Sequence, residues 1–159
     1  MKLYLAQHGE AVSELKDQAR PLSNKGKEDV AAVAAFLRER GVHVGEVWHS
    51  TKVRARETAE ILAEALLPGK NPIERAGLAP NDATEALLDE LSAVKGDLLI
   101  VSHLPVLSRL SSLLITGRDA YVPVFFHQGG VVCLDREGMG PFGVEWAVTP
   151  GLVGRSVRR

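Results

Sequence analysis

Apolar and polar residues recur along the first two thirds of this chain in two alternating patterns. Short apolar runs are typical of buried strands, whereas apolar residues spaced three and four apart are typical of one helix face. In the first such helix, Val30, Ala34 and Leu37 share a face. Ser23 can cap its start, and Gly41 can end it. The patterns predict strands at 3–6, 44–48, 73–76 and 98–101, and helices at about 23–40, 52–67, 81–94 and from Pro105 onward.

The run at 98–101 is the most strand-like segment, because it is apolar without alternation and so must be buried on both faces. After Tyr121 the pattern changes, and strands predicted at 122–126, 131–135 and 144–148 follow one another without a helix. Antiparallel hairpins are the natural links between such strands. We therefore expect one α/β domain over 1–159. It would be a three-layer α/β/α sandwich with a mostly parallel central sheet, antiparallel C-terminal strands and a basic tail at about 152–159.

The composition is that of a globular protein without a strong net charge. Over 159 residues, 19 Lys and Arg offset 20 Asp and Glu, which gives a formal net charge of −1. A nearly neutral chain does not attract nucleic acid or an anionic membrane surface, so neither is expected as a partner. The arginines of the tail, at 155, 158 and 159, are interpreted as a solvated chain end.

Cys133 is the only cysteine, which excludes an internal disulfide and a cysteine-rich metal site. It lies in the apolar run 131–134 and is expected to be a small buried core residue. The apolar start at 1–6 is too short for a signal peptide. No apolar stretch approaches the roughly 20 residues needed to span a bilayer. These features predict a cytoplasmic protein.

Three of the predicted parallel strands end in residues suited to phosphoryl chemistry. The first strand is followed by Gln7-His8-Gly9-Glu10 and the strand at 98–101 by Ser102-His103. The strand at 44–48 is followed by His49-Ser50, with Arg54 one turn into the next helix. The carboxyl ends of parallel strands converge on one rim, where α/β sheets bind their ligands. We therefore expect His8, Arg54 and His103 around one site.

Each of these signals, taken singly, also has a plain structural explanation. His43 and His127 are interpreted as ordinary loop or core residues, and Arg38 and Arg56 as solvated charges on helices. His49 lies beside the expected rim, but its side chain could equally point into the sheet.

A zinc site formed by His8, His49 and His103 is the metal alternative. Lys52 and Arg54 belong to the same rim, and their charges repel a dication. No metal is therefore expected.

Three motifs together resemble the histidine phosphatase superfamily, whose members share a phosphoglycerate-mutase-like fold. The first is Gln7-His8-Gly9-Glu10-Ala11, and the last is Ser102-His103-Leu104-Pro105. Between them lies Ser50-Thr51-Lys52-Val53-Arg54-Ala55-Arg56-Glu57-Thr58-Ala59. The short length and Arg20-Pro21-Leu22-Ser23, followed by Gly26, resemble the phosphohistidine phosphatase (SixA) branch. The resemblance covers nearly the whole chain, in the family's order.

The resemblance implies a phosphatase that works through a covalent phosphohistidine intermediate, without a metal or organic cofactor. His8 would be the nucleophile, because a neutral imidazole nitrogen can attack phosphorus. Arg54 would clamp the anionic phosphoryl group with its guanidinium fork, and His103 would hold another oxygen. Three further residues would support them: Gly9 by letting the backbone approach the phosphate, and Glu10 and Ser102 by orienting the histidines.

The first motif departs from the family's pattern, because Gln7 stands where the family usually has arginine. Glutamine donates hydrogen bonds but carries no charge, so the phosphate site is weaker unless another cation substitutes. Arg20 on the loop after the first strand, and then Lys52, are the candidates for that cation. Arg20 could equally be a surface loop charge, and the protein a phosphoprotein-binding module without catalysis.

Family members that act on alcohol esters generally supply a carboxylic acid after the third strand to protonate the leaving alkoxide. Glu74 and Asp82 are the only carboxylates at 74–82, and the sequence singles out neither. An imidazole needs no strong acid to leave, since its conjugate acid has a pKa of about 6.5. The short chain also has no long insertion to enclose a small substrate.

The leading hypothesis is therefore a phosphatase acting on the phosphohistidine of a partner protein, with inorganic phosphate as product. The partner would be a histidine phosphotransfer domain or a phosphocarrier. A small-molecule phosphomonoesterase of the same superfamily is the alternative enzyme.

Overall fold

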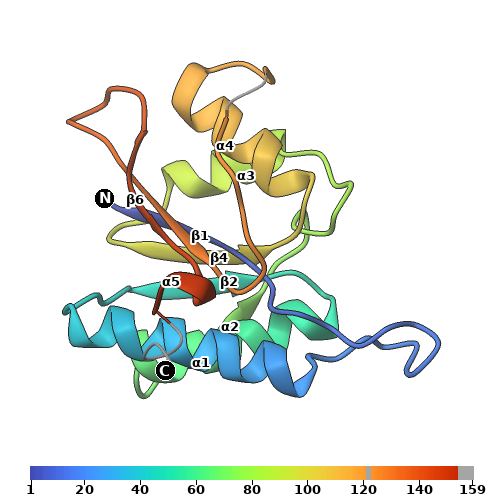
Figure 1. The fold of residues 1–159 in the computed structure, drawn as a ribbon. Coiled ribbons are helices and arrows are strands. Elements are labelled where there is room, and N and C mark those ends of the chain that lie inside the picture. Colours follow the sequence, from blue (N-terminus) through green and yellow to red (C-terminus); the bar gives the residue numbers. More distant parts are fainter. Residues whose placement is uncertain (121–122, 154–159) are drawn as a thin grey trace.

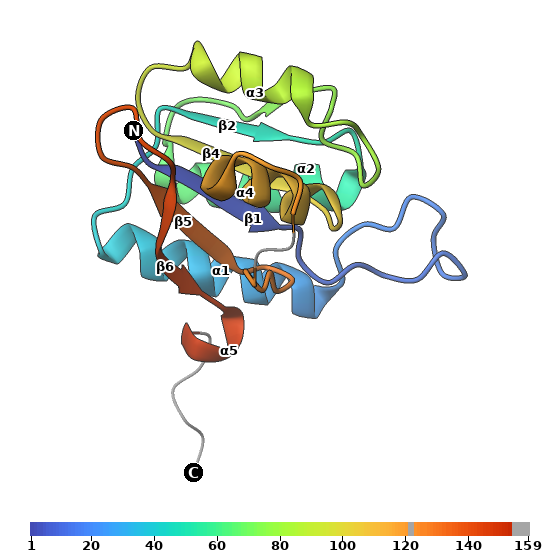
Figure 2. The ribbon, with the colours of Figure 1, turned by 90° about the horizontal axis from the view of Figure 1, so that it is seen from above.

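The structure is a computed structural model that describes residues 1–120 and 123–153. One six-stranded sheet, in the order β3-β2-β4-β1-β5-β6, has helices on both faces (Figures 1 and 2). The strands are β1 (Leu3–Gln7), β2 (Glu46–His49), β3 (Ile73–Glu74), β4 (Leu98–Ser102), β5 (Val131–Asp135) and β6 (Gly143–Val148). The helices are α1 (Asn24–Glu39), α2 (Val53–Leu66), α3 (Glu85–Ser92), α4 (Val106–Thr116) and α5 (Pro150–Val153). The predicted three-layer α/β sandwich is confirmed.

The pairing of the strands brings the carboxyl ends of β1, β2 and β4 to one edge of the sheet. β4 is parallel to both neighbours, with Ser102 opposite Gln7 of β1 and Val101 opposite His49 of β2. β5 runs antiparallel to β1, and β6 runs antiparallel to β5. The predicted parallel core with antiparallel C-terminal strands is therefore correct.

The central strand β4 is buried along its whole length, as its unbroken apolar pattern predicts. Leu99 and Val101 pack into the core against α1 and α2, and Leu98 and Ile100 pack into the core against α3 and α4. Alternate residues of a strand point to opposite faces, so one strand contributes to both cores. Each fully buried leucine of this kind stabilises the fold by about 1.5–3 kcal/mol.

The strand predicted at 122–126 is wrong. Residues 123–126 form no strand in the described structure, and Val122 lies outside the described residues. Val124 and Phe126 pack against the α3–α4 core while Phe125 is exposed, so the apolar alternation reflects an extended segment with one buried side. Both edges of β1 are taken by β4 and β5, and Pro123 has no N–H to donate to a sheet.

The first two residues of the predicted tail at 152–159 belong to a short helix. Residues 152 and 153 belong to α5, where Val153 packs against the core, and residues 154–159 of the predicted tail lie outside the described residues.

Cys133 is fully buried in β5, as expected, and burial raises the pKa of its thiol to about 12. Within 1–120 and 123–153, no helix has both the length and the apolar character to cross a bilayer.

The start of α1 is fastened to the loop that follows β1. The Ser23 hydroxyl caps the helix by accepting a hydrogen bond from the Gly26 N–H at 3.0 Å, and it donates to the Glu10 carboxylate at 2.7 Å. The Glu10 carbonyl also accepts from the Ser23 N–H at 2.9 Å. The loop therefore passes so close to the helix that a Cβ on Gly26 would lie 2.1 Å from the Glu10 carbonyl oxygen.

Replacing Gly26 by alanine is expected to destabilise the protein, although alanine normally favours a helix over glycine by about 1 kcal/mol. The contact with a backbone oxygen cannot be relieved by a side-chain rotation, so the loop must move, at a cost of about 1–3 kcal/mol. Urea unfolding of Gly26→Ala measures the loss. The control is Lys27→Ala, an exposed position in the same turn. A Gly26→Ala protein as stable as the wild type would contradict this account.

Candidate active site

The main chain at the end of β1 is held from both sides. The His8 N–H donates to the Ser102 carbonyl of β4 at 3.1 Å. On the other side, the Gly129 N–H lies 3.0 Å from the Gln7 carbonyl and 3.1 Å from that of His8. These bonds leave little freedom to the backbone that carries His8, and they place its side chain at the carboxyl edge of the sheet.

The imidazole of His8 is buried and has a defined tautomer. Its Nδ1 lies 2.7 Å from the carbonyl oxygen of Gly9, which can only accept a hydrogen bond, so Nδ1 carries the proton. Nε2 of the neutral ring therefore keeps its lone pair. Burial, and then the positive charges of Arg54 and Arg20, lower the pKa of His8 below its ordinary value of 6.5. The ring is consequently neutral at pH 7, as a nucleophile must be.

His103 follows β4 and faces His8 across the rim. The two ring centroids are 5.0 Å apart, and His103 is 2% exposed. Its Nε2 lies 2.6 Å from the hydroxyl oxygen of Ser50, which also accepts the Lys52 N–H at 3.3 Å. Burial, followed by the neighbouring His8, Arg54 and Lys52, lowers the pKa of His103 to about 3.

Arg54 lies in the first turn of α2, and its charge acts on both imidazoles. Burial, followed by the charge of Arg20, lowers the pKa of its guanidinium, whereas Glu14 raises it. Within the described residues, two buried nitrogens of the site have no hydrogen-bond partner: Nε of Arg54 and Nδ1 of His103. When the Ser50 hydroxyl donates to Nε2 of His103, the proton of the neutral ring sits on Nδ1. Both nitrogens are then buried donors that an anion would satisfy.

Arg20 approaches the site from the loop between β1 and α1. It is held in a left-handed backbone conformation, with φ of 48°, and its Nε donates to the Val12 carbonyl at 3.1 Å. Its charge acts on both His8 and Arg54. Lys52 precedes α2 and is exposed, and its charge acts on His103. Both substitute cations suggested by the sequence therefore stand close enough to influence the site.

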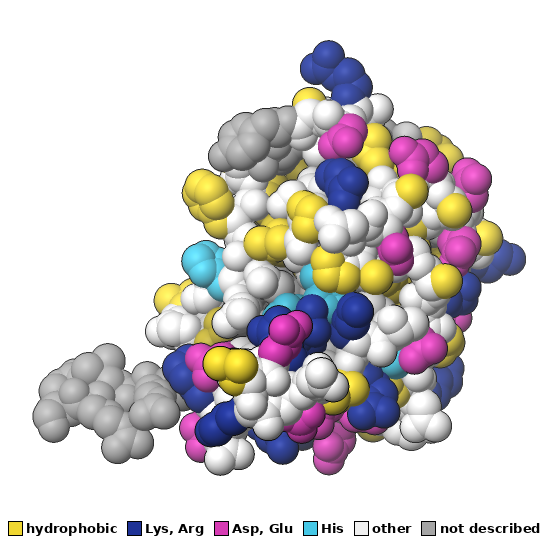
Figure 3. Space-filling model, turned by 90° about the vertical axis from the view of Figure 1, so that its right-hand side faces the viewer, with side chains coloured by type: hydrophobic (Ala, Val, Ile, Leu, Met, Phe, Trp, Pro, Cys, Tyr) yellow, Lys and Arg dark blue, Asp and Glu magenta, His cyan; other side chains and the backbone are white. Residues whose placement is uncertain are grey.

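The carboxyl edge of the sheet gathers these groups on one face of the molecule. Figure 3 shows histidine atoms near the centre of this face, directly beside a group of Lys and Arg side chains. Gln7 is half-buried at the end of β1, and strand alternation puts it on the same side of the sheet as Leu3 and Leu5, toward α3 and α4. Gln7 brings no charge to the site.

Three of the expected supporting residues, Gly9, Glu10 and Ser102, make contacts that stabilise the fold. A Cβ on Gly9 would lie 2.9 Å from Val30 and 3.2 Å from Leu22, so glycine is needed there for packing. The Ser102 hydroxyl donates to the Leu78 carbonyl at 2.5 Å, and the Glu10 carboxylate accepts from Ser23. These two side chains bond to loop groups, and their expected role in orienting the histidines stays a prediction.

Ser50 and Thr58 hold the site in ways that the sequence did not assign. Ser50 is fully buried and binds His103. Thr58, also fully buried, accepts the Gly9 N–H at 3.0 Å and donates to the Arg54 carbonyl at 2.8 Å, which connects β1 to α2. Both residues belong to the motif at 50–59, so the sequence contained them. Their hydrogen-bond partners depend on tertiary contacts, which the sequence does not show.

The other histidines, and the arginines interpreted as solvated charges, have different surroundings. His43, His127, Arg38 and Arg56 are exposed, as expected. His49 is buried, its Nδ1 donates to the Ser50 carbonyl at 2.7 Å, and its side chain lines a separate cavity with Arg56. The described residues contain no group of three or more His, Cys, Asp or Glu side chains suited to a metal ion.

The two carboxylates considered as a general acid have other surroundings. Glu74 is exposed in the edge strand β3, where it is paired with His49. Asp82 accepts the Ala79 N–H at 2.9 Å and so closes a turn. Neither carboxylate appears among the charges that shift the pKa of His8, His103 or Arg54.

Comparison with known proteins points to one family. A family profile, the Histidine phosphatase superfamily (branch 1), matches residues 3–80, which include His8 and Arg54. An uncharacterized protein of Picosynechococcus sp. is 35% identical over 128 residues, covering 76% of this chain and 77% of that protein.

Two solved structures share the fold over nearly their whole lengths. The protein histidine phosphatase SixA, solved with tungstate, has a TM-score of 0.81 at 24% identity, covering 96% of this chain and 99% of that one. A SixA protein of Nakamurella multipartitia has a TM-score of 0.67 at 25% identity, covering 94% and 95% respectively. The chain belongs to the histidine phosphatase superfamily, and as a member of it is a phosphatase.

Proposed function

We propose that this phosphatase removes the phosphoryl group from a phosphohistidine of a partner protein, through a covalent intermediate on His8. The observation that carries the proposal is the neutral His8 ring with its free Nε2, beside the unpartnered donors of Arg54 and His103. A neutral imidazole in the same site as buried, unpartnered nitrogens suits attack on an anionic phosphoryl group. The similarity to SixA phosphatases supports the choice of phosphohistidine.

The reaction proceeds in two displacements. In the first, Nε2 of His8 attacks phosphorus, and the P–N bond to the substrate histidine breaks with its electron pair going to the departing imidazole. That ring leaves neutral when its other nitrogen already carries a proton. In the second, water attacks the phosphorus on His8, and the P–N bond breaks with its electron pair returning to Nε2. The proton that the water gives up goes to a phosphate oxygen, so inorganic phosphate and a neutral His8 are released. Arg54, His103, Arg20 and Lys52 stabilise the negative charge in both steps.

The choice of a phosphoamide over an alcohol ester rests on the leaving group. An alkoxide needs a proton from a well-placed acid, whereas an imidazole, whose conjugate acid has a pKa of about 6.5, does not. Glu74 is exposed at the sheet edge, and Asp82 is engaged in a turn. The small-molecule phosphomonoesterase is therefore the less favoured activity, and a panel of phosphate esters measures it directly.

Loss of His8 or Arg54 is expected to abolish or sharply reduce phosphate release from a phosphohistidine protein. His8→Ala removes the nucleophile, and Arg54→Ala removes a charge-assisted clamp, which corresponds to about 10–100-fold in kcat/KM. Arg56→Ala is the matched control, since Arg56 is an exposed arginine of the same helix that lines a different cavity. Equal phosphate release by all three variants would rule out the proposed mechanism.

Arg20 is expected to replace the positive charge that Gln7 lacks. Arg20→Ala should lower kcat/KM by about tenfold or more, the effect of one charged hydrogen bond. Gln7→Arg in the Arg20→Ala protein should restore most of the loss, because a cation returns to the same site. An unchanged kcat/KM in Arg20→Ala would contradict this role and would identify Arg20 as a surface loop charge. A wild type that is inert until Gln7→Arg is introduced would favour the binding-module hypothesis.

The two imidazoles are expected to be neutral at pH 7, because the pKa of each is lowered. In a ¹⁵N NMR titration of the free protein, the His8 ring should protonate below its ordinary 6.5, and that of His103 at about 3. Arg54→Ala removes a positive charge that disfavours imidazolium, so both midpoints should rise. The midpoint of His8 should not move in Arg56→Ala. A His8 midpoint above 6.5 in the wild type would contradict the site's electrostatics.

A further inference from the structure

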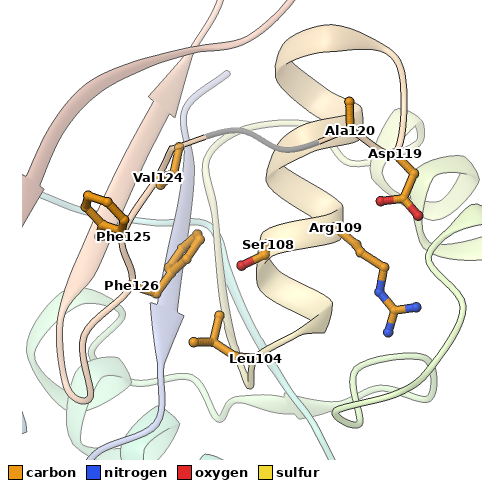
Figure 4. A pocket seen from close by; sticks show the side chains of 8 residues that line it. All are labelled: Leu104, Ser108, Arg109, Asp119, Ala120, Val124, Phe125 and Phe126. Atoms are coloured by element: carbon orange, nitrogen blue, oxygen red, sulfur yellow. The ribbon is translucent and has the colours of Figure 1, made fainter.

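A groove of about 410 Å³ lies between α4 and the extended segment 123–126. Figure 4 shows Val124 and Phe126 on one side of α4, Arg109 and Asp119 on the other, and Leu104 at the foot of the helix. The groove thus has an apolar wall and a charged wall. Neither wall belongs to the group of residues assigned to phosphoryl chemistry.

The groove adjoins the candidate active site through Leu104 and through the extended segment 123–126. Leu104 directly follows His103 in the chain. Phe126 is separated by two residues from Gly129, whose N–H bonds to the carbonyls of Gln7 and His8. Residues that line the groove are therefore close in the chain to the segments that hold His8 and His103.

The lining of the groove indicates what such a segment would carry. Phe125 is 73% exposed and Leu104 is 42% exposed, so both offer apolar surface to a partner. Arg109 makes no ion pair with the residues at 1–120 and 123–153, and its buried Nε has no hydrogen-bond partner there. A buried guanidinium nitrogen without an acceptor favours a carboxylate, whose oxygens match its geometry.

We infer that this groove docks the segment of the phosphoprotein that flanks its phosphohistidine. An apolar side chain of that segment packs on Leu104 and Phe125, and an acidic side chain pairs with Arg109. The inference rests on the proposed function, since it takes the partner to be the phosphohistidine protein that His8 attacks. The groove would add affinity for a protein substrate and none for a small phosphoamide, which does not reach it.

Binding measured without turnover tests the groove separately from the chemistry. In the His8→Ala background, the Kd of a phosphorylated histidine phosphotransfer domain is measured for Phe125→Ala and for Arg109→Ala. Each should raise Kd by about tenfold, the effect of a central interface residue. Leu152→Ala is the matched control: Leu152 is also 73% exposed but belongs to α5, on the opposite face of the sheet. It should leave Kd unchanged.

Turnover of phosphoramidate by Phe125→Ala and Arg109→Ala, with His8 intact, should stay within twofold of the wild type. Two results would overturn the docking proposal. One is an unchanged Kd in both groove variants, and the other is no measurable binding by the His8→Ala protein whose groove is intact. An equal loss of phosphoramidate turnover in these variants would also overturn it, since the groove would then be part of the chemical site. A wild type that cleaves neither substrate contradicts the proposed function, whereas the Kd values still decide the groove.

Discussion

The register of β1 against β4 is the constraint on which the candidate site depends. Gln7 lies opposite Ser102, so the residues that follow the two strands, His8 and His103, emerge side by side. Their ring centroids are 5.0 Å apart although 95 positions separate them in the chain. A slip of one residue would turn alternate side chains of β1 from one core to the other, so the burial of the strand enforces the register. The same packing that stabilises the sheet thus places the two imidazoles.

Burial gives these imidazoles their chemical state. Removing them from water disfavours their charged forms, and the cations Arg54, Arg20 and Lys52 add repulsion, so the pKa values of both rings fall. A neutral His8 is a competent nucleophile, and a hydrogen bond to the Gly9 carbonyl leaves Nε2 available for attack. The arrangement is unfavourable for the free protein, because donors and positive charges gather without an anion to satisfy them. Under the proposed function, a bound phosphoryl group would relieve that cost.

Our proposal that Arg20 supplies the positive charge that Gln7 lacks moves that charge from a strand end to a loop. A residue at the end of β1 is held rigidly by the sheet, whereas Arg20 reaches the site from a loop, with a left-handed backbone and a bond to the Val12 carbonyl. Near it, the loop that follows β1 is fastened to α1 through Ser23, Glu10 and the close approach at Gly26. The stability of this junction and the position of the cation are therefore linked through one segment of backbone.

Local patterns were sufficient for most of the fold. The periodicity around Val30 and Leu37 and the cap at Ser23 predicted α1 closely, and the unbroken run Leu98–Ser102 marked the central strand. The segment at 122–126 failed because its alternation describes one buried side, and an apolar pattern cannot show whether a strand partner is free. Hydrophobic pattern is a property of neighbours in sequence, whereas sheet pairing depends on which edges other strands have already occupied.

In the candidate site, too, the local sequence determined some features and tertiary contacts determined others. The sequence by itself determined the types of residue in the site. It also determined the strand ends followed by His8 and His103 and the helix turn that carries Arg54, because strand–helix boundaries and motif spacing are local. Only the tertiary structure decided that Ser50 binds His103, that Thr58 connects Gly9 to α2, and that Glu10 and Ser102 bond to loops. Hydrogen-bond partners and pKa values arise from groups distant in the chain that packing brings within a few ångströms, and no local pattern encodes those distances.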